Sequence, residues 1–472
     1  MGSIILFIFS LILRLISANQ SFWLDEGASI MFARLPLFSF FTSIAGDFHP
    51  PLYYLILHFW LPLAGRTEWL IRLPNVIFGA LCIPVFYWLL KQVLGKEKKR
   101  FAMIGAVLLM VNPLHIYYSA ELRMYSLNAL LSLFSWLYLL KALKDKNNDH
   151  HPWRIFTIFT VLNFYTFYGS FFNSLAQFLF IFWQHRSKLK PLLICNLVAV
   201  ILFLPWLPTL LKQLAGGGYL TKVLPGWSEL SGNLSPKSLG LIMAKFTFGR
   251  ITLANKSAYA IFVAGISLYF LLCSYLASLS KEGRVFLVWF YSSIAIAILV
   301  SLRTPILGYW RYIFLLPAFI AIIVIGLSNL PQTAANLNIF LVFFVFILGN
   351  GVFLLTPGLH REDWRSAAQI ISKDNSISIV NFPDVFAPLK FYASGVYFYP
   401  DQISLGKMRP DLDQSLPLVL KGKTSIFVFD YLSDLSDKKR SILRWLKEAG
   451  FKQLATRNVN GVGFIYEFTA PK

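Results

Sequence analysis

The sequence predicts a polytopic α-helical membrane protein that ends in a small soluble α/β domain. Of the whole chain, 57% is hydrophobic and only 14% is charged, whereas soluble domains carry roughly 25% charged residues. Apolar segments near bilayer length recur up to residue 356. From residue 360 onward the chain holds 16 Lys/Arg and 12 Asp/Glu in 113 residues, a balance that is typical of a soluble surface.

We expect about eleven membrane crossings, since a helix needs roughly 20 residues to cross a bilayer. The fifth and sixth are short and are joined only by Tyr168-Gly169-Ser170, so they form a helical hairpin or include a re-entrant piece. The first resembles a signal-peptide core, but no Lys or Arg precedes it and a poor cleavage site follows, which favours a retained helix. The segments lie at about 3–19, 69–94, 101–119, 122–141, 154–168, 170–184, 191–211, 257–279, 285–301, 306–327 and 337–356.

The distribution of basic residues predicts the orientation. With a cytoplasmic N-terminus, the short outside connections carry little beyond Arg123 and Arg303, which the positive-inside rule favours. We therefore expect a multi-pass protein of the cytoplasmic (plasma) membrane with an extracytoplasmic C-terminal domain. The net charge of +21 is set against this topology, and no nucleic-acid partner is expected. The four inside loops then hold 13 Lys/Arg, at 96–100, 141–154, 186–190 and 281–284.

The chain divides into a membrane domain at 1–356 and an α/β domain at 360–472. The α/β domain shows no nucleophile motif or phosphate-binding loop, so we expect it to support the membrane domain or bind an acceptor rather than catalyse. Its expected elements are helices at 364–372 and 438–449, strands at 376–381 and 424–430, and a hairpin at 451–457 and 463–468 that turns at Asn460-Gly461.

Carboxylates are rare in the membrane domain, and the orientation separates them by side. Ten occur before residue 360. Four lie in cytoplasmic loops amid Lys and Arg, where a solvated charge is expected: Glu97, Asp145, Asp149 and Glu282. An acid/base group of an enzyme is therefore expected among the six that face outside. These are Asp25, Glu26, Asp47, Glu68, Glu121 and Glu229.

Three clusters of ionisable residues stand out on the outer side, at 23–26, 47–54 and 117–125. The first two lie in a long external loop at 19–67, in which we expect interfacial helices, and a second long external loop is expected at 212–256. Ionisable groups at membrane depth are costly, so such clusters indicate function.

The first two clusters also have structural interpretations. Asp25 could cap a helix over residues 27–35, although capping alone does not require the neighbouring carboxylate of Glu26. His49 could merely precede two prolines that start an interfacial helix. Both interpretations are open at the level of the sequence.

The third cluster has its own alternatives. Glu121 and Arg123 are two residues apart and do not share a helix face, so each needs its own partner. Either could form a structural ion pair elsewhere in the bundle. The aromatic residues of this cluster favour anchoring at the membrane interface over a binding platform. They are Tyr117, Tyr118 and Tyr125.

Taken together, these motifs resemble those of the GT-C membrane glycosyltransferases. The resemblance rests on Asp25-Glu26, a His-Pro-Pro-Leu-Tyr-Tyr segment from His49, a Glu-Leu-Arg-Met-Tyr turn from Glu121, and an Arg-Tyr pair at Arg311. Within that superfamily the chain is similar to bacterial and archaeal relatives of the protein O-mannosyltransferases and of the aminoarabinose lipid A transferases. The resemblance covers about residues 1–330 well. The C-terminal domain matches only loosely, mainly through Glu362-Asp363-Trp364-Arg365.

The resemblance implies a polyprenyl-phosphate-sugar-dependent glycosyltransferase that acts at the outer face of the membrane. By position, Asp25 would be the general base, and Glu26 would contact substrate or tune the pKa of the base. The chemistry is consistent, because a carboxylate can deprotonate an acceptor hydroxyl in line with displacement at the anomeric carbon, with inversion. A sugar already linked to phosphate needs no nucleotide-binding fold, and none is recognisable among the spans.

The departing lipid phosphate needs cations at membrane depth. Arg311 is the first candidate, because it begins a long apolar span and Arg can bind two phosphate oxygens. Arg123 and Arg303 follow, and snorkelling to the head groups is the alternative for Arg303 and Arg311. Further donor- or acceptor-binding candidates are Asp47, His49, Glu121, Tyr125 and Tyr312.

No cofactor is required by the residues. The three cysteines lie far apart in apolar spans, without disulfide or zinc spacing. The loop that holds Asp47 and His49 could bring them to Asp25, so a divalent metal is possible but not expected. The resemblance implies no obligatory metal for the mannosyltransferase branch and a divalent ion for the oligosaccharyltransferase branch.

The main alternative is a lipid-linked sugar flippase or another transporter. A transporter should place ionisable residues near the midplane of several spans and show related halves. Here the acids cluster at one mouth and no internal repeat is evident, which favours an enzyme. A membrane scaffold would leave Asp25-Glu26 and Glu121 unexplained. Protein, glycolipid and cell-wall glycan acceptors are all compatible with the residues.

Overall fold

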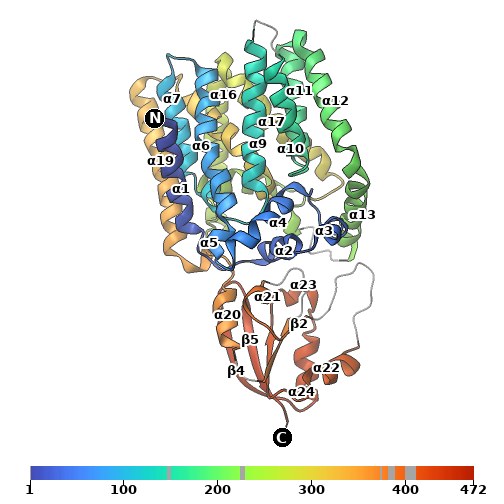
Figure 1. Cartoon of the computed structure of the whole chain (residues 1–472). Coiled ribbons are helices and arrows are strands. Elements are labelled where there is room, and N and C mark those ends of the chain that lie inside the picture. Colours follow the sequence, from blue (N-terminus) through green and yellow to red (C-terminus); the bar gives the residue numbers. More distant parts are fainter. Residues whose placement is uncertain are drawn as a thin grey trace.

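The structure is a computed structural model that describes residues 2–145, 150–223, 229–372, 375–380, 388–398 and 411–471. A helical bundle forms the larger part, and a domain with a five-stranded sheet forms the smaller one. The sheet domain lies against one end of the bundle, and short helices lie between the two (Figure 1).

Seven helices of the described residues are long and apolar enough to cross a bilayer, so the chain is a membrane protein. An eighth span arises if α7 (Lys99–Val111) and α8 (Pro113–Ser119), which bend by 58°, count as one. The seven are α6 (Leu73–Leu94), α9 (Tyr125–Lys144), the run Arg186–Gly218, α16 (Lys256–Ser278), α17 (Lys281–Ser301), the run Tyr309–Leu327 and α19 (Gln332–Leu355).

The expected eleven crossings are not confirmed. Three of the segments counted from the sequence form helices of only 14 to 16 residues, which is below the roughly 17 that cross a bilayer without distortion. They are α1 (Gly2–Ser17), α10 (His151–Phe164) and α11 (Ser170–Gln184). The run Arg186–Gly218 consists of η1 (Arg186–Lys188), α12 (Leu189–Phe203), η2 (Leu204–Trp206) and the start of α13 (Leu207–Val223), and the run Tyr309–Leu327 consists of η3 (Tyr309–Leu315) and α18 (Leu316–Leu327).

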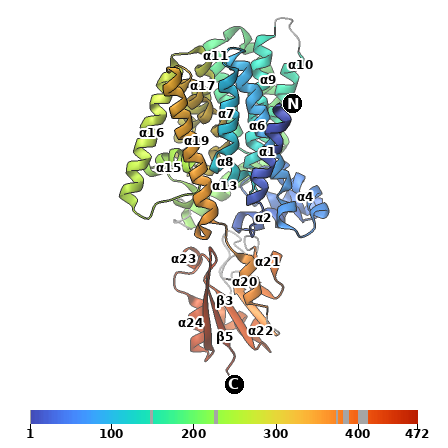
Figure 2. The ribbon, with the colours of Figure 1, turned by 90° about the vertical axis from the view of Figure 1, so that its left-hand side faces the viewer.

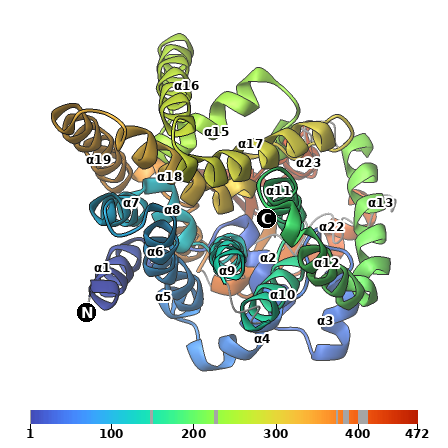
Figure 3. The same cartoon turned by 90° about the horizontal axis from the view of Figure 1, so that it is seen from above.

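The spans are arranged around a buried centre. The run Tyr309–Leu327, α6 and α9 are mostly buried inside the bundle, whereas α16, α19 and the run Arg186–Gly218 are mostly exposed. Seen from above, α16, α19 and α12 lie at the periphery (Figure 3). An apolar helix that remains exposed in the protein is suited to contact with lipid. The turns after α6, α11 and α16 lie at the end of the bundle away from the sheet domain (Figure 2).

The external segment after α1 folds into four short helices, α2 (Leu24–Ala33), α3 (Leu37–Ile44), α4 (Leu52–Ala64) and α5 (Glu68–Ile71). The interpretation of Asp25 as the cap of a helix over residues 27–35 is wrong. The helix begins at Leu24, and the Trp23 N–H donates to the Glu26 carboxylate at 3.3 Å. An acid three residues after the N-cap commonly takes this position, so the helix starts early enough to include both acids.

The second external loop is also largely helical, with the end of α13 followed by α15 (Pro236–Phe248). Between them, Gly232 adopts a φ of +91° and packs against the chain before Arg311. The Leu307 N–H donates to the Gly232 carbonyl at 2.8 Å, and a Cβ on Gly232 would lie 2.1 Å from the Gly308 nitrogen. Only glycine fits this close approach.

The sheet of the C-terminal domain has the strand order β2-β1-β3-β5-β4. The pairs of β1 with β2 and β3 are parallel, and those of β5 with β3 and β4 are antiparallel. The predicted hairpin is confirmed, with Val459 paired to Gly463 and Gly461 at a φ of +72°. Residue 381, the predicted end of β1, lies outside the described residues. The strands are β1 (Ser376–Val380), β2 (Val396–Phe398), β3 (Ser425–Phe429), β4 (Lys452–Val459) and β5 (Gly463–Thr469).

Helices cover both faces of this sheet, and β3 has side chains in both cores. Phe427 and Phe429 pack with Trp364 of α20 (Trp364–Ile370), while Ile426 and Val428 pack on the opposite face, as the alternation of a strand requires. The predicted helices at 364–372 and 438–449 are confirmed as α20 and α24. The remaining elements are η4 (Pro357–Leu359), α21 (Leu389–Tyr392), α22 (Leu412–Leu420), α23 (Ser433–Ser436) and α24 (Ser441–Glu448).

Candidate active site

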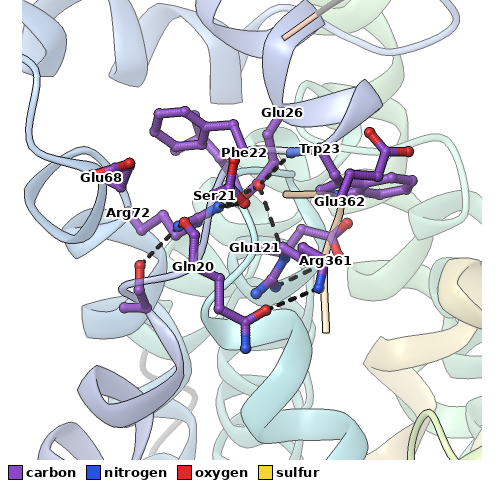
Figure 4. Close-up of polar contacts among 12 residues, drawn as sticks. Gln20, Ser21, Phe22, Trp23, Glu26, Glu68, Arg72, Glu121, Arg361 and Glu362 are labelled. Carbon is purple, nitrogen blue, oxygen red and sulfur yellow. Dashed lines mark hydrogen bonds and ion pairs between the residues drawn. The ribbon is translucent and has the colours of Figure 1, made fainter. Parts of the chain in front are cut away.

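Three segments that are far apart in sequence meet at the end of the bundle that faces the sheet domain. They are residues 20–26 at the start of α2, the turn 120–124 between α8 and α9, and residues 361–365 after the last span (Figure 4). Two of the three clusters of ionisable residues expected from the sequence therefore lie together, and a third segment from the C-terminal part joins them.

The Glu26 carboxylate holds α2 to the bundle. It is fully buried, and Arg72 donates to both of its oxygens, from Nε to Oε1 at 2.7 Å and from Nη2 to Oε2 at 2.5 Å. The Leu122 N–H donates to Oε1 at 2.8 Å. Burial raises the pKa of Glu26, but the charges of Arg72 and Arg361 and these hydrogen bonds outweigh it and hold the pKa below its usual value. Both oxygens face protein donors, so this geometry offers Glu26 no contact with a substrate.

Asp25 is adjacent in sequence but lies in a different environment. Its side chain is 30% exposed, whereas that of Glu26 is 0% exposed. Its ion-pair partner is Arg123, with 3.8 Å between Oδ2 and Nε. An accessible carboxylate that is loosely paired with one arginine can still accept a proton from a group that enters from solvent.

Arg123 connects Asp25 to the second cluster. Its Nη1 lies 3.2 Å from the Tyr54 hydroxyl and its Nη2 lies 3.4 Å from His49 Nε2. The Tyr54 hydroxyl donates to Asp47 at 2.5 Å, and His49 Nδ1 lies 3.2 Å from the same Asp47 oxygen. Burial raises the pKa of Asp47, but His49, Arg123 and Tyr54 outweigh it and hold the pKa well below the usual range. Asp47 and His49 thus lie near Asp25, with the Arg123 side chain between them.

Glu121 and Arg361 form a buried and poorly bonded pair. Glu121 Oε2 has no hydrogen-bond partner among the described residues and lies 3.9 Å from Arg361 Nη2. Burial raises the pKa of Glu121 to about 8, and the charge of Arg361 offsets this only in part. Arg361 Nε lies 3.8 Å from Glu26, and Nη2 donates to the Tyr117 carbonyl at 3.1 Å. Glu121 and Arg123 have separate partners, as their spacing requires.

The interpretation of Tyr117, Tyr118 and Tyr125 as membrane-interface anchors is wrong. All three are buried and form a chain of edge-to-face rings, with centroids 5.1 Å and 5.4 Å apart. The Tyr117 ring contacts the guanidinium groups of Arg361 and Arg250, at 4.3 Å and 5.0 Å from its centroid. The tight turn between α8 and α9 folds these rings inward, so they form a wall of the site.

The binding candidates predicted near the late spans lie in different environments. The Arg311 side chain donates to the Ser231 carbonyl, and its charge interacts with those of Asp25 and Arg123, so it lies at the site. Arg303 is exposed, and no hydrogen bond or ion pair of its side chain occurs within the described residues. The buried Tyr312 donates to a main-chain carbonyl at 3.0 Å, which is a packing role.

The structure adds two basic residues that the sequence interpretation passed over as charges of a long loop. Arg250 Nη1 donates to the Tyr309 hydroxyl at 3.0 Å. Lys245 Nζ donates to the main-chain carbonyls of Arg250 and Ile251, at 3.1 Å and 2.7 Å. Burial and the charge of Arg250 lower the pKa of Lys245 to about 7. No sequence motif indicates a role for these residues, because only the fold brings residues 245–250 against the tyrosine wall.

An apolar cavity of about 410 Å³ begins beside these basic residues. Thr247 and Phe248, at the end of α15, line one side of it, and residues of α16, α18 and α19 line the rest. Its size is within the roughly 300–1,000 Å³ of ligand sites. Among the lining residues, Gly265 has open space where a side chain would be.

The residues considered for a metal do not fit one. The Arg123 guanidinium lies 3.2 Å from His49 Nδ1 and pairs with Asp25, so a cation already occupies the space between them. Across the described ranges, no group of three or more His, Cys, Asp or Glu could hold a metal ion. These residues therefore supply hydrogen bonds to one another in this arrangement.

The fold is similar to that of solved membrane glycosyltransferases, and one stretch of the chain matches a family model, both in line with the resemblance found in the motifs. Residues 48–208 match the family described as dolichyl-phosphate-mannose-protein mannosyltransferase. No curated protein sequence matches the chain.

Solved structures match over nearly the whole chain. ArnT from Cupriavidus metallidurans aligns over 100% of this chain and 99% of its own, with a TM-score of 0.63 and 13% identity. The same protein bound to undecaprenyl phosphate aligns with a TM-score of 0.60. The archaeal oligosaccharyltransferase AglB from Archaeoglobus fulgidus, in complex with an inhibitory peptide and a dolichol-phosphate, aligns over 98% of this chain and 73% of its own, with a TM-score of 0.55 and 13% identity. At such identities the matches establish the fold alone.

Proposed function

We propose that the protein transfers a sugar from a polyprenyl-phosphate-linked donor to an acceptor hydroxyl at the outer face of the cytoplasmic membrane. The contrast within the acid pair carries this proposal, because Asp25 is accessible and loosely paired while Glu26 is buried and fully bonded. The matched family and the lipid phosphates bound to ArnT and AglB support the donor class. The reaction is that of an inverting glycosyltransferase (EC 2.4-type).

In this reaction Asp25 acts as the general base. It takes the proton of the acceptor hydroxyl while that oxygen attacks the anomeric carbon from the face opposite the departing lipid phosphate. Arg123 lies beside the Asp25 carboxylate as its loose ion-pair partner, and it is itself held by the Tyr54 hydroxyl and by His49. Glu26 is a positioning residue that fixes the start of α2 through Arg72.

The departing phosphate needs positive charge that is already in place. Arg311 interacts with the charge of Asp25, and Arg250 lies against the Tyr117 ring. Both can place donors near a phosphate at the tyrosine wall, with Lys245 behind Arg250. The apolar cavity that begins at Phe248 is suited to part of the isoprenoid chain, because its lining is almost entirely hydrophobic.

The arrangement of the chain supports the proposed orientation. The turns after α6, α11 and α16, which are rich in Lys and Arg, lie at the end of the bundle opposite the sheet domain (Figure 2), and positively charged turns favour the cytoplasmic side. The N-terminus is then cytoplasmic, and the site and the sheet domain are outside. The partners are the bilayer, a lipid-linked sugar and a protein, glycolipid or glycan acceptor.

An in vitro transfer assay tests the proposal. Purified protein is given a panel of radiolabelled polyprenyl-phosphate sugars and membrane extract as the acceptor source, and wild type is compared with Asp25→Asn and Glu229→Gln. General-base catalysis contributes roughly 10²- to 10⁴-fold, so Asp25→Asn should lose at least about 100-fold of the transfer rate. Glu229 is exposed, and its variant is the matched control.

Two results would count against the proposal. Equal transfer by wild type and Asp25→Asn would remove Asp25 as the base. No transfer from any donor, together with movement of lipid-linked sugar across reconstituted vesicles by both proteins, would favour the transporter instead.

A further inference from the structure

Residues 361–365 lie along the segment that leads into α2. The Arg361 N–H donates to Gln20 Oε1 at 3.1 Å, and the Arg365 N–H donates to Ser21 Oγ at 3.2 Å. The Arg365 side chain pairs with Glu68 at 2.8 Å. Figure 4 shows Glu362 beside Trp23, within this row of contacts. The first residues after the last span are therefore attached to the external segment of the membrane domain.

The Glu362 carboxylate accepts three hydrogen bonds from three different residues. Oε2 accepts the Leu24 N–H at 3.1 Å and Trp364 Nε1–H at 2.7 Å, and Oε1 accepts the Tyr431 hydroxyl at 2.8 Å. Leu24 is the first residue of α2, and N–H groups of a first helical turn have no acceptor within the helix. Trp364 and Tyr431 belong to one core of the sheet domain. One carboxylate thus joins α2 to α20 and to the loop that follows β3.

The sheet domain also approaches α2 through its backbone. A Cβ on Gly27 would lie 3.2 Å from atoms of Pro388, which is tighter than ordinary van der Waals contact. On the side of the bundle, Glu26 ties the same turn to Arg72. Asp25 lies between these two attachments, one residue after Leu24 and one residue before Glu26.

We propose that Glu362 is a positioning residue through which the sheet domain fixes the first turn of α2 and thereby the direction of the Asp25 carboxylate. This inference rests on the proposed function, since Asp25 is the base of that reaction. The sheet domain then has a defined role in transfer that needs no catalytic group of its own.

Three full-length proteins test this role: Glu362→Ala, Glu362→Gln and the control Glu448→Gln, whose side chain is exposed on the same domain. Hydrogen–deuterium exchange of the peptide that covers residues 20–34 reports on the attachment, and kcat and KM for transfer report on its effect. A displacement of about 1 Å at a reacting group can cost about 100-fold. We therefore expect Glu362→Ala to exchange faster at the start of α2 and to lose about 10- to 100-fold in kcat, with KM for the donor within about twofold of wild type.

The conservative variant separates positioning from folding. Gln keeps one oxygen that can accept from Leu24, so Glu362→Gln should recover part of the lost kcat, while Glu448→Gln should match wild type. Unchanged exchange at residues 20–34 in Glu362→Ala would overturn the inference, as would an effect on KM alone. Absence of transfer in wild type would overturn the proposed function instead, and the exchange measurement would still decide whether Glu362 holds α2.

Discussion

The substitutions Asp25→Asn and Glu26→Gln should impair the protein in two different ways. Glu26 is fully buried and bonded to Arg72 at 2.7 Å and 2.5 Å. Removing one partner of a buried ion pair costs about 3–5 kcal/mol, because the other charge stays buried. The Asp25 side chain is 30% exposed and 3.8 Å from Arg123, and such a pair contributes about 0–1 kcal/mol. Glu26→Gln should therefore lower the free energy of unfolding by about 3 kcal/mol, the lower end of that range, because Gln keeps one acceptor for Arg72.

Both quantities can be measured on the same purified samples. Denaturant unfolding in detergent, followed by tryptophan fluorescence, gives stability, and the transfer assay gives activity. Asp25→Asn should unfold at the same denaturant concentration as wild type but lose transfer. Glu26→Gln should unfold at a lower denaturant concentration. The double change Glu26→Gln/Arg72→Gln should cost less than the sum of the two single changes, because Glu26 and Arg72 are direct partners. A Glu26→Gln protein as stable as wild type would refute the reasoning, and so would an Asp25→Asn protein that is the less stable of the two.

Two further predictions concern the donor. Arg250→Ala should raise KM for the polyprenyl-phosphate sugar about tenfold or more, because charge-assisted hydrogen bonds contribute about 1.5–3 kcal/mol. Arg303→Ala, the control, should leave KM unchanged. Equal effects of the two substitutions would contradict the proposed placement of the phosphate. Gly265→Leu fills open space in the apolar cavity. It should raise the donor KM without lowering the melting temperature. Its control is Gly351→Leu, which also meets open space but lies outside the cavity lining.

The candidate base could be found from the sequence because its signal is local. Acids are rare in the membrane domain, so an adjacent pair such as Asp25-Glu26 is conspicuous from the order of residues alone. The different environments of the two acids could not be found in this way. They depend on Arg72 and Arg361, which lie 46 and 335 positions from Glu26 and become its neighbours only through packing. A charge pattern along the chain carries no information about such partners.

The errors in the sequence interpretation also have physical causes. Tyr117, Tyr118 and Tyr125 are amphipathic residues near span ends, and composition alone favours the membrane interface for them. The turn at 120–124 instead folds them against one another in the interior. The count of eleven crossings is not confirmed, for a related reason. Hydropathy counts apolar residues, but where a helix such as α10 or α11 begins and ends is decided by packing and by local turns.

The raised pKa of Glu121 couples the charge of the site to pH. Its folded value of about 8 lies above its ordinary value of 4.5, so the folded protein holds this proton at neutral pH and releases it as pH rises through about 8. While Glu121 is neutral, Arg361 is paired with Glu26, which Arg72 also neutralises, so positive charge remains at the tyrosine wall for a lipid phosphate. Once Glu121 ionises, its negative charge neutralises that of Arg361 and weakens the attraction for the phosphate. The donor KM of wild type should therefore rise between pH 7 and pH 9, whereas the KM of Glu121→Gln should rise less, because only the loss of charge on Lys245, with its pKa of about 7, remains. A parallel rise in both proteins would show that another group controls donor binding.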